Sequence, residues 1–229
     1  MTDVVDGAAL LLSLKLALLT VAILVPIGIL AGRWLATGDF AARPLVEAIF
    51  ALPLVLPPTV LGYYLLVALG GSSPLGRWYE AATGQSLVFT FDGLLVASVV
   101  FNLPFAIQPL QRAFEAIPED LRHAASCCGL TTWQSLWRIE LPLAWSGLLT
   151  AVVLTFAHTL GEFGVVLMVG GSIPGETKTV AIAIYDRVQG FDMAGAGWMS
   201  ALLLALSIVA ITVTYWTSSR QRRKHACAD

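Results

Sequence analysis

The chain has 229 residues, of which 57% are hydrophobic and 12% are charged, and its formal net charge is −2. Soluble domains carry about 25% charged residues, so this composition excludes an ordinary soluble protein and predicts an all-α protein that spans a membrane. Cys127, Cys128 and Cys227 have neither the spacing nor the neighbours of metal ligands. We therefore expect no metal site, no other cofactor and no nucleic-acid partner.

Five apolar segments are long enough to cross the bilayer, because a transmembrane helix needs roughly 20 apolar residues. They are residues 8–31, 44–69, 91–111, 141–160 and 194–216, and we treat residues 1–229 as a single transmembrane domain. The first segment contains Lys15 and no cleavage site, which favours a retained span over a removed signal peptide. A further apolar segment, Phe163–Ser172, is too short to cross and is predicted to be a surface or re-entrant segment.

The connections between these segments differ in their content of Lys and Arg, which indicates orientation because cytoplasmic loops carry the excess. The basic residues of the first connection, the third connection and the C-terminal tail are Arg33, Arg43, Arg112, Arg122, Arg138, Arg220, Arg222, Arg223 and Lys224. In the N-terminus and in the second and fourth connections, acidic residues match or outnumber basic ones. The pattern predicts an outside N-terminus, a cytoplasmic C-terminus and a cytoplasmic loop over residues 112–140.

Prolines interrupt the second predicted span. Pro53, Pro57 and Pro58 each lack a backbone N–H, so carbonyl groups lose their helical partners at membrane depth. Such backbone is tolerated where protein or a water-filled path surrounds it, and the Thr59 hydroxyl could face that path. For any single proline, a kink packed against neighbouring helices is the alternative.

The loop over residues 118–142 is too polar to span the membrane and too regular to be a flexible linker. Pro118 and the two acidic residues after it are typical of a helix start. Gly129 stands where a left-handed helix cap is expected, and Thr131 or Thr132 can start a second helix. The apolar faces are Leu121, Ala124, Ala125 and Cys128 in the first helix and Trp133, Leu136 and Trp137 in the second. Such helices dock into a partner or lie on the bilayer, and the scarcity of basic residues favours docking.

Ionisable and amide side chains within the spans are functional candidates, because burying them in lipid is costly. Lys15 lies near the outer interface and can extend its ammonium group to it. His158 and Glu162 lie one turn apart near the outer end of the fourth span. We expect Glu162 to be hydrogen-bonded at the mouth rather than to bind an anion, because like charges repel. Asn102 and Gln108 either donate to an oxyanion or join helices, and joining helices is commoner.

His123-Ala124-Ala125 is followed after three residues by Gly129, and after nine more by Ile139-Glu140-Leu141-Pro142. This spacing resembles the signature loop of ABC importer permeases, EAA-x3-G-x9-I-x-LP, with His123 in place of the family's Glu. The resemblance implies the type I ABC importer permease fold and a loop that couples the protein to an ATPase. The coupling residues it implies are His123, Ala124, Ala125, Gly129, Ile139, Leu141 and Pro142.

Two further segments, Leu52–Tyr64 and Leu160–Gly164 with the following Ile173-Pro174-Gly175, are similar to those of molybdate permeases within this superfamily. His158 stands where the related permeases tend to have Arg. The translocation path implied by this resemblance consists of Pro57, Pro58, Thr59, His158, Gly161, Glu162, Phe163 and Gly164. The cargo implied is molybdate, with tungstate as a second oxyanion. Sulfate permeases share the Gly-Glu-Phe-Gly element, so a sulfate permease is the alternative.

None of the three lysines lies in a phosphate-binding G-x-x-x-x-G-K-[ST] loop, so we expect a transport subunit of the bacterial inner membrane rather than an enzyme. The resemblance implies cytoplasmic ABC ATPase subunits and an extracytoplasmic oxyanion-binding protein as partners. A two-fold homodimer is expected, because one chain of five helices encloses no obvious path. The rival interpretation is an ion-coupled secondary transporter or channel. Its usual internal repeat and mid-membrane carboxylate are not evident.

Overall fold

The computed structural model describes the backbone of residues 6–226 and the side chains of residues 6–212. Every regular element within that range is a helix, which confirms the predicted all-α fold. The predictions made for the basic tail, Arg220 to Lys224, and for Cys227 lie outside the described side chains. The elements in chain order are α1 Gly7–Thr37, α2 Arg43–Val55, α3 Pro58–Leu69, α4 Pro74–Thr83, α5 Phe91–Glu115, α6 Glu119–Cys127, α7 Thr132–Ser135, the π-helical turn η1 Leu136–Glu140, α8 Leu141–Leu143, α9 Trp145–Gly161, α10 Gly164–Gly170, α11 Val180–Gln189 and α12 Met193–Ala226.

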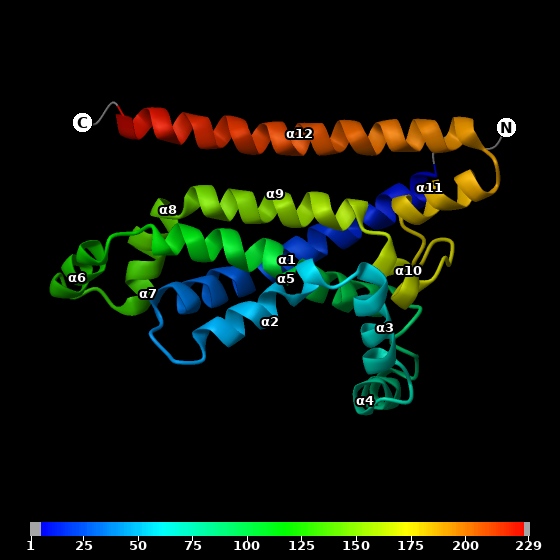
Figure 1. Ribbon diagram of the computed structural model, residues 1–229, viewed down its shortest axis with the longest axis horizontal. Coiled ribbons are helices and arrows are strands. Elements are labelled where there is room, and N and C mark those ends of the chain that lie inside the picture. Colours follow the sequence, from blue (N-terminus) through cyan, green and yellow to red (C-terminus); the bar gives the residue numbers. More distant parts are fainter. Residues whose placement is uncertain (1–5, 227–229) are drawn as a thin grey trace.

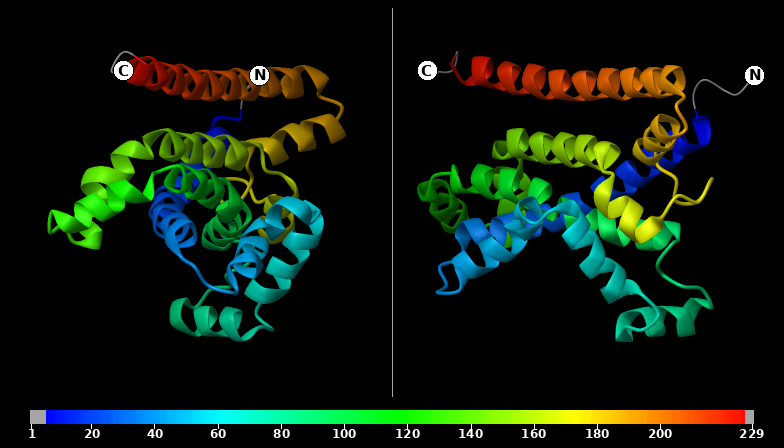
Figure 2. Two further views of the ribbon diagram at one scale, coloured as in Figure 1. Left: turned by 60° about the vertical axis from the view of Figure 1, so that its left-hand side comes forward. Right: turned by 45° about the vertical axis from the view of Figure 1, so that its right-hand side comes forward.

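Helices α1, α5 and α9 lie side by side and form the centre of the molecule (Figures 1 and 2). Small residues allow this close packing: a Cβ added to Gly32 of α1 would lie 2.9 Å from the backbone nitrogen of Gln111 in α5. Such glycines let helices approach closely in membranes, where dispersion contacts rather than hydrophobic exclusion hold them together. Helix α12 runs alongside α9 and leaves most of its described surface exposed.

Three helices are individually long and apolar enough to cross a membrane: α1, α5 and residues 193–212 of α12. Two bent pairs supply up to two more spans, with a bend of 110° between α2 and α3 and of 76° between α7–α8 and α9. The second predicted span thus corresponds to two helices broken next to Pro57, and the chain bends within the fourth predicted span between α8 and α9.

The bundle has two distinct ends (Figure 1). Helices α6 to α8 lie at one end together with the C-terminal end of α12, and we call this the loop end. Helices α10 and α11 lie at the opposite end with the start of α1, where the Val180 N–H donates to Ser13 Oγ over 2.8 Å. Helix α10 packs against α3 and α5 with Val165, Val166 and Val169 fully buried. Most of the segment Phe163–Ser172 therefore packs inside the bundle, and whether it is a surface or a re-entrant segment of the membrane stays a prediction.

Candidate functional site

Helix α6 ends in a tight left-handed cap at Gly129, as the sequence predicts. The φ angle of Gly129 is +76°, and the N–H groups of Gly129 and Leu130 donate to the carbonyls of Ser126 and Ala125. These are the two hydrogen bonds of a Schellman motif. No atom lies within 4 Å of a Cβ built on Gly129, so the backbone angle and not the available space requires glycine.

Thr131 starts the second loop helix, which confirms one of the two predicted caps. Its hydroxyl accepts from the Gln134 N–H at 3.2 Å, and its own N–H donates to Gln134 Oε1 at 2.9 Å, forming a capping box. The helix then widens into the π-helical turn η1, which no sequence signal predicted. The last motif residues follow this turn: Ile139 and Leu141 are half-buried, and Pro142 is exposed.

The predicted apolar face of α6 remains largely uncovered. His123, Ala124 and Gly129 are exposed, as is Leu121, whereas Ala125 is 5% exposed and packs inside the chain. The structure therefore divides the predicted coupling residues: Ala125 holds α6 in place, and its neighbours present an accessible surface. An exposed apolar face on a short helix is typical of a docking element.

The tryptophans of the second loop helix face a different environment. Trp133 and Trp137, whose rings contact edge to face with centroids 5.6 Å apart, line an entirely apolar cavity of about 440 Å³. Its other walls come from α1, α8 and α9 and include Pro26 and Trp145. Tryptophan is enriched where a membrane protein meets the bilayer interface, so this part of the loop suits lipid rather than a protein partner.

A buried carboxylate, Glu140, joins the loop to the bundle. Its oxygens accept two hydrogen bonds from the Arg33 guanidinium of α1, at 3.0 and 2.9 Å, and a third from Ser135 Oγ at 3.1 Å. Arg122 of α6 forms a 3.5 Å ion pair with the same carboxylate and also donates to the carbonyl of Phe114 at the end of α5. We call Arg33, Arg122, Ser135 and Glu140 the Glu140 cluster. It connects α1, α5, α6 and η1 in one set of contacts.

The charge of Glu140 is stabilised although its side chain is fully buried. Burial raises the pKa of this carboxyl, but the hydrogen bonds and charge of Arg33, with Ser135 and Arg122, outweigh burial and hold the pKa below its usual range. Sequence reasoning assigned Glu140 no role of its own. The available signal was an acidic residue directly before an apolar span, which burial makes costly unless a cation is near.

At the opposite end, two predicted path segments more than 100 residues apart in sequence come into contact. A Cβ added to Gly164 would lie 2.8 Å from the Cβ of Pro58, so the start of α10 lies directly against the break between α2 and α3. Pro57, Pro58 and Thr59 are exposed at this break. The Pro57 carbonyl accepts from the N–H groups of Val60 and Leu61, which satisfies the first turn of α3.

Glu162 lies in the turn between α9 and α10 and is hydrogen-bonded, as expected. Its side chain is largely buried, and Oε1 accepts from the Val165 N–H at 2.8 Å, which caps α10. Gly161 beside it is exposed with no atom within 4 Å of an added Cβ. The Phe163 ring contacts the Tyr185 ring of α11 with centroids 4.9 Å apart. This turn therefore orders α10 rather than presenting a free carboxylate.

His158 lies apart from that turn, between two aromatic rings and an amide. Its Nδ1 is 3.1 Å from Asn102 Oδ1, and its ring stacks with Phe101 and lies 4.0 Å from the Phe105 centroid. Asn102 also donates to the Ser98 carbonyl. Asn102 thus joins α5 to α9 by a hydrogen bond, which confirms the commoner of its two predicted roles.

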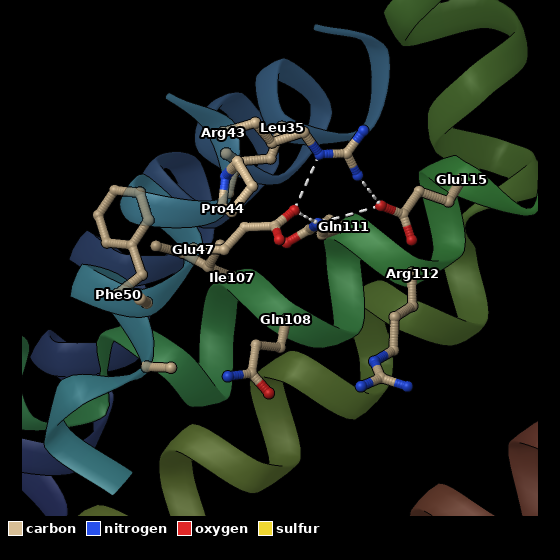
Figure 3. A pocket seen from close by; sticks show the side chains of 12 residues that line it. Leu35, Arg43, Pro44, Glu47, Phe50, Ile107, Gln108, Gln111, Arg112 and Glu115 are labelled. Carbon is tan, nitrogen blue, oxygen red and sulfur yellow. Dashed lines mark hydrogen bonds and ion pairs between the residues drawn. The ribbon is translucent and has the colours of Figure 1, made fainter. Parts of the chain in front are cut away.

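A cavity of about 560 Å³ opens between α2 and α5 at the loop end (Figure 3). Arg43 forms ion pairs with both Glu47 and Glu115, and Gln111 Nε2 donates to the same two carboxylates at 2.7 and 3.0 Å. These four side chains form a closed network on one side of the cavity (Figure 3). Gln108 and Arg112 also line it, and their side chains point away from that network.

This geometry defines a class of protein. It is a helical bundle of the membrane permease type, with a protruding loop of the kind that couples a permease to a partner. Residues 24–224 match the family described as binding-protein-dependent transport system inner membrane component, and the chain belongs to that family. It is 45% identical over 216 residues to the molybdenum transport system permease protein ModB of Azotobacter vinelandii, covering 94% of this chain and 95% of that protein. It is 30% identical over 206 residues to the sulfate transport system permease protein CysW of Synechocystis, covering 90% and 74%.

The fold is also that of a solved importer. The crystal structure of a bacterial ABC transporter involved in the import of the acidic polysaccharide alginate matches with a TM-score of 0.74 and 17% identity, covering 97% of this chain and 80% of that one. At this identity the similarity concerns the fold alone. It confirms the ABC importer permease fold that the signature loop implied.

Proposed function

We propose that this chain is the membrane-spanning permease subunit of an ATP-driven importer for molybdate, with tungstate as a second substrate. The observation that carries the proposal is the similarity to the molybdenum transport permease of Azotobacter vinelandii, which extends over nearly the whole of both chains. The greater distance and smaller coverage of the sulfate permease make sulfate the second candidate.

The proposed assembly is a two-fold homodimer in the bacterial inner membrane, with the oxyanion path between the copies. The loop end faces the cytoplasm because it carries Arg33, Arg43, Arg112, Arg122 and Arg138. An extracytoplasmic binding protein delivers the oxyanion to the opposite end, and ABC ATPase subunits dock at the loop end. The five proposed spans are α1, the α2–α3 pair, α5, α8 with α9, and α12.

The exposed face of α6 is the proposed ATPase contact, with His123, Ala124 and Gly129 at the surface. Displacement of α6 reaches the bundle through the Glu140 cluster, because Arg122 belongs to α6 and Arg33 to α1. Ile139, Leu141 and Pro142 continue this link towards α9. The Pro57–Thr59 break and the Gly161–Gly164 turn, which meet at Pro58 and Gly164, line the outer part of the proposed path.

Substrate choice is tested in a strain lacking this chain, by initial uptake of labelled molybdate, tungstate and sulfate at equal concentrations. The expected result is that the wild-type gene restores molybdate and tungstate uptake and leaves sulfate uptake unchanged. Rescue of sulfate uptake alone would replace molybdate with sulfate in the proposal. Uptake by the purified chain in vesicles without any ATPase would instead support the secondary transporter or channel.

The docking surface is tested with Gly129→Arg, which adds a bulky cation to the exposed cap of α6. We expect ATPase copurification and oxyanion uptake to fall at least tenfold. Gly84→Arg is a matched control: Gly84 has a φ of +74° and no atom within 4 Å of an added Cβ, but it follows α4. It introduces the same side chain and the same backbone strain elsewhere. Equal ATPase copurification for wild type and Gly129→Arg would show that α6 is not the docking surface.

A further inference from the structure

The apolar cavity of about 440 Å³ lies between the loop and the bundle. Trp133 and Trp137 form its loop side, and α1 forms a second wall with residues between Val25 and Leu30. Trp145, at the start of α9, belongs to a third wall. The lining is entirely apolar, so a hydrated ion would lose its water there without gaining a partner, which is costly. The cavity therefore suits a hydrocarbon group.

The cavity is placed where the proposed spans leave the membrane at the loop end. Its α1 wall falls in the last two turns of the first predicted span, and its α9 wall is the first turn of α9. Leu30 and Trp145 are exposed, so the cavity opens at the side of the bundle. A space between two spanning helices that opens sideways near the bilayer surface meets the acyl chains of the adjoining leaflet.

The rim of the cavity offers hydrogen-bond donors. Trp133, Trp137 and Trp145 are exposed, and their indole N–H groups have no partner among the described residues. Because the lining is apolar, these N–H groups do not face the interior of the cavity. Tryptophan rings at a membrane surface combine an apolar body with a donor directed to the lipid headgroups. The rim thus suits the polar end of a lipid whose chain enters the cavity.

One uncompensated cation lies beside this rim. Arg138 directly follows Trp137, is exposed, and forms no hydrogen bond or ion pair with any described residue. The other charged residues close to the cavity on the elements that line it are Arg33 and Glu140, which pair with each other. Helix α6, which carries the other acidic residues of the loop, does not line the cavity. The surroundings of the cavity are therefore positive, and a guanidinium group suits a phosphate.

We propose that this cavity binds an acyl chain of an anionic phospholipid from the leaflet at the loop end, with the lipid phosphate at Arg138. The proposal goes beyond the transport function and depends neither on the cargo nor on the ATPase. The bound chain fills the space between α1 and the turn η1, which contains Glu140. The lipid thereby holds the loop against the bundle.

The test uses the full chain purified in detergent, with phospholipids whose acyl chains carry bromine, which quenches tryptophan fluorescence on contact. The chain has seven tryptophans, and Trp34, Trp78, Trp198 and Trp216 are replaced by phenylalanine so that the three at the cavity report alone. Brominated phosphatidylglycerol, which is anionic, is compared with brominated phosphatidylcholine, which has no net charge. The measured quantity is the lipid-to-detergent ratio that gives half of the maximal quenching. Membrane orientation does not enter, because micelles have no sides.

We expect phosphatidylglycerol to reach half-quenching at a ratio about fivefold lower, the effect of one arginine near an anionic headgroup. Arg138→Gln should abolish this preference, and Arg138→Lys should keep most of it because the charge remains. Arg77→Gln is the matched control, an exposed arginine of α4 without a partner among the described residues, and should keep the full preference.

The place of the chain is tested separately with Val25→Phe, which narrows the cavity from the α1 side. The maximal quenching by both lipids should fall, because the chain no longer reaches the tryptophans. Val67→Phe adds the same group to an exposed position of α3 and should leave quenching unchanged. Each variant is compared after it elutes from size-exclusion chromatography at the volume of the reporter protein.

Equal half-quenching ratios for the two lipids in the reporter protein would overturn the proposal, since the cavity would then meet only the general lipid shell. A full preference in Arg138→Gln, or full quenching in Val25→Phe, would do the same. Weak quenching by both lipids in a protein that elutes as a dimer would mean that a second copy covers the cavity instead. Failure of the proposed transport function leaves these readings unaffected, because neither an oxyanion nor an ATPase is present.

Discussion

Two contacts, one at each end of the bundle, hold the chain together in different ways. At the loop end, one buried carboxylate, Glu140, receives donors from Arg33, Arg122 and Ser135. At the opposite end, Gly164 lies against Pro58, and Gly62 lies against Met168, where an added Cβ would come within 2.8 Å of existing carbon atoms. The Glu140 contact depends on charges that are present, and the glycine contacts depend on atoms that are absent. The first is broken by removing a group, the second by adding one.

This difference fits the tasks proposed for the two ends. A cluster of directional charge contacts connects several helices at once, so a shift of α6 changes contacts on α1 and α5 together. Close contacts at small residues fix the distance between two helices without any polar group. Such contacts suit helices that pack at membrane depth.

The largest effect is expected for Glu140→Ala. The change leaves Arg33 and Arg122 facing each other without a counter-charge, and removing one partner of a buried ion pair costs about 3–5 kcal/mol. The midpoint of thermal unfolding in detergent should fall strongly, and less ATPase should copurify. Glu80→Ala removes an exposed carboxylate of α4 and should leave the midpoint nearly unchanged. If both variants unfold at the same temperature, the Glu140 cluster does not hold the loop end together.

A smaller loss is expected for Gly164→Ala at the opposite end. The added methyl would overlap Pro58, and overpacking of this kind costs about 1–3 kcal/mol. Gly161→Ala is the matched control three residues earlier, because no atom lies within 4 Å of its added Cβ. The thermal midpoint should fall for Gly164→Ala only. Equal behaviour of the two alanine variants would contradict the close contact between α10 and the helix break.

The parts of this structure that sequence reasoning found are those determined by local chemistry. The left-handed cap at Gly129 and the N-terminal cap at Thr131 depend on residues within five positions of each other, so their signals are complete within the segment. Apolar length likewise indicated α1, α5 and α12 as segments that can cross a membrane. The signature spacing placed the loop at the correct point between α5 and α9.

The parts that were missed depend on contacts between distant segments. Arg33 and Glu140 are 107 positions apart, and each alone resembles an ordinary charged residue beside a span. The contact between Pro58 and Gly164 requires α10 to fold back between α3 and α5, and a short apolar segment carries no signal for that path. The cavity between α2 and α5 brings together Arg43 and Glu47 of α2 with Glu115 of α5, which is 72 positions from Arg43.

The smallest effect is expected between the two ends, at the hydrogen bond that His158 Nδ1 donates to Asn102 Oδ1. Single hydrogen bonds between membrane helices contribute about 0.6 kcal/mol on average, because other partners are found when one is lost. A double-mutant cycle with Asn102→Leu and His158→Phe separates this bond from the packing of either side chain. Phenylalanine keeps a ring between Phe101 and Phe105, so the stacking is largely preserved.

We expect a coupling free energy near that average, measured from unfolding of the four proteins in detergent. A coupling free energy well above that average, about 2 kcal/mol or more, would mean that the middle of the bundle also contains a strong contact. The contrast between the two ends would then no longer describe what holds the bundle together. Strict additivity would mean that the bond contributes nothing measurable. In that case His158 is held by its two aromatic neighbours, and α5 meets α9 through apolar packing alone.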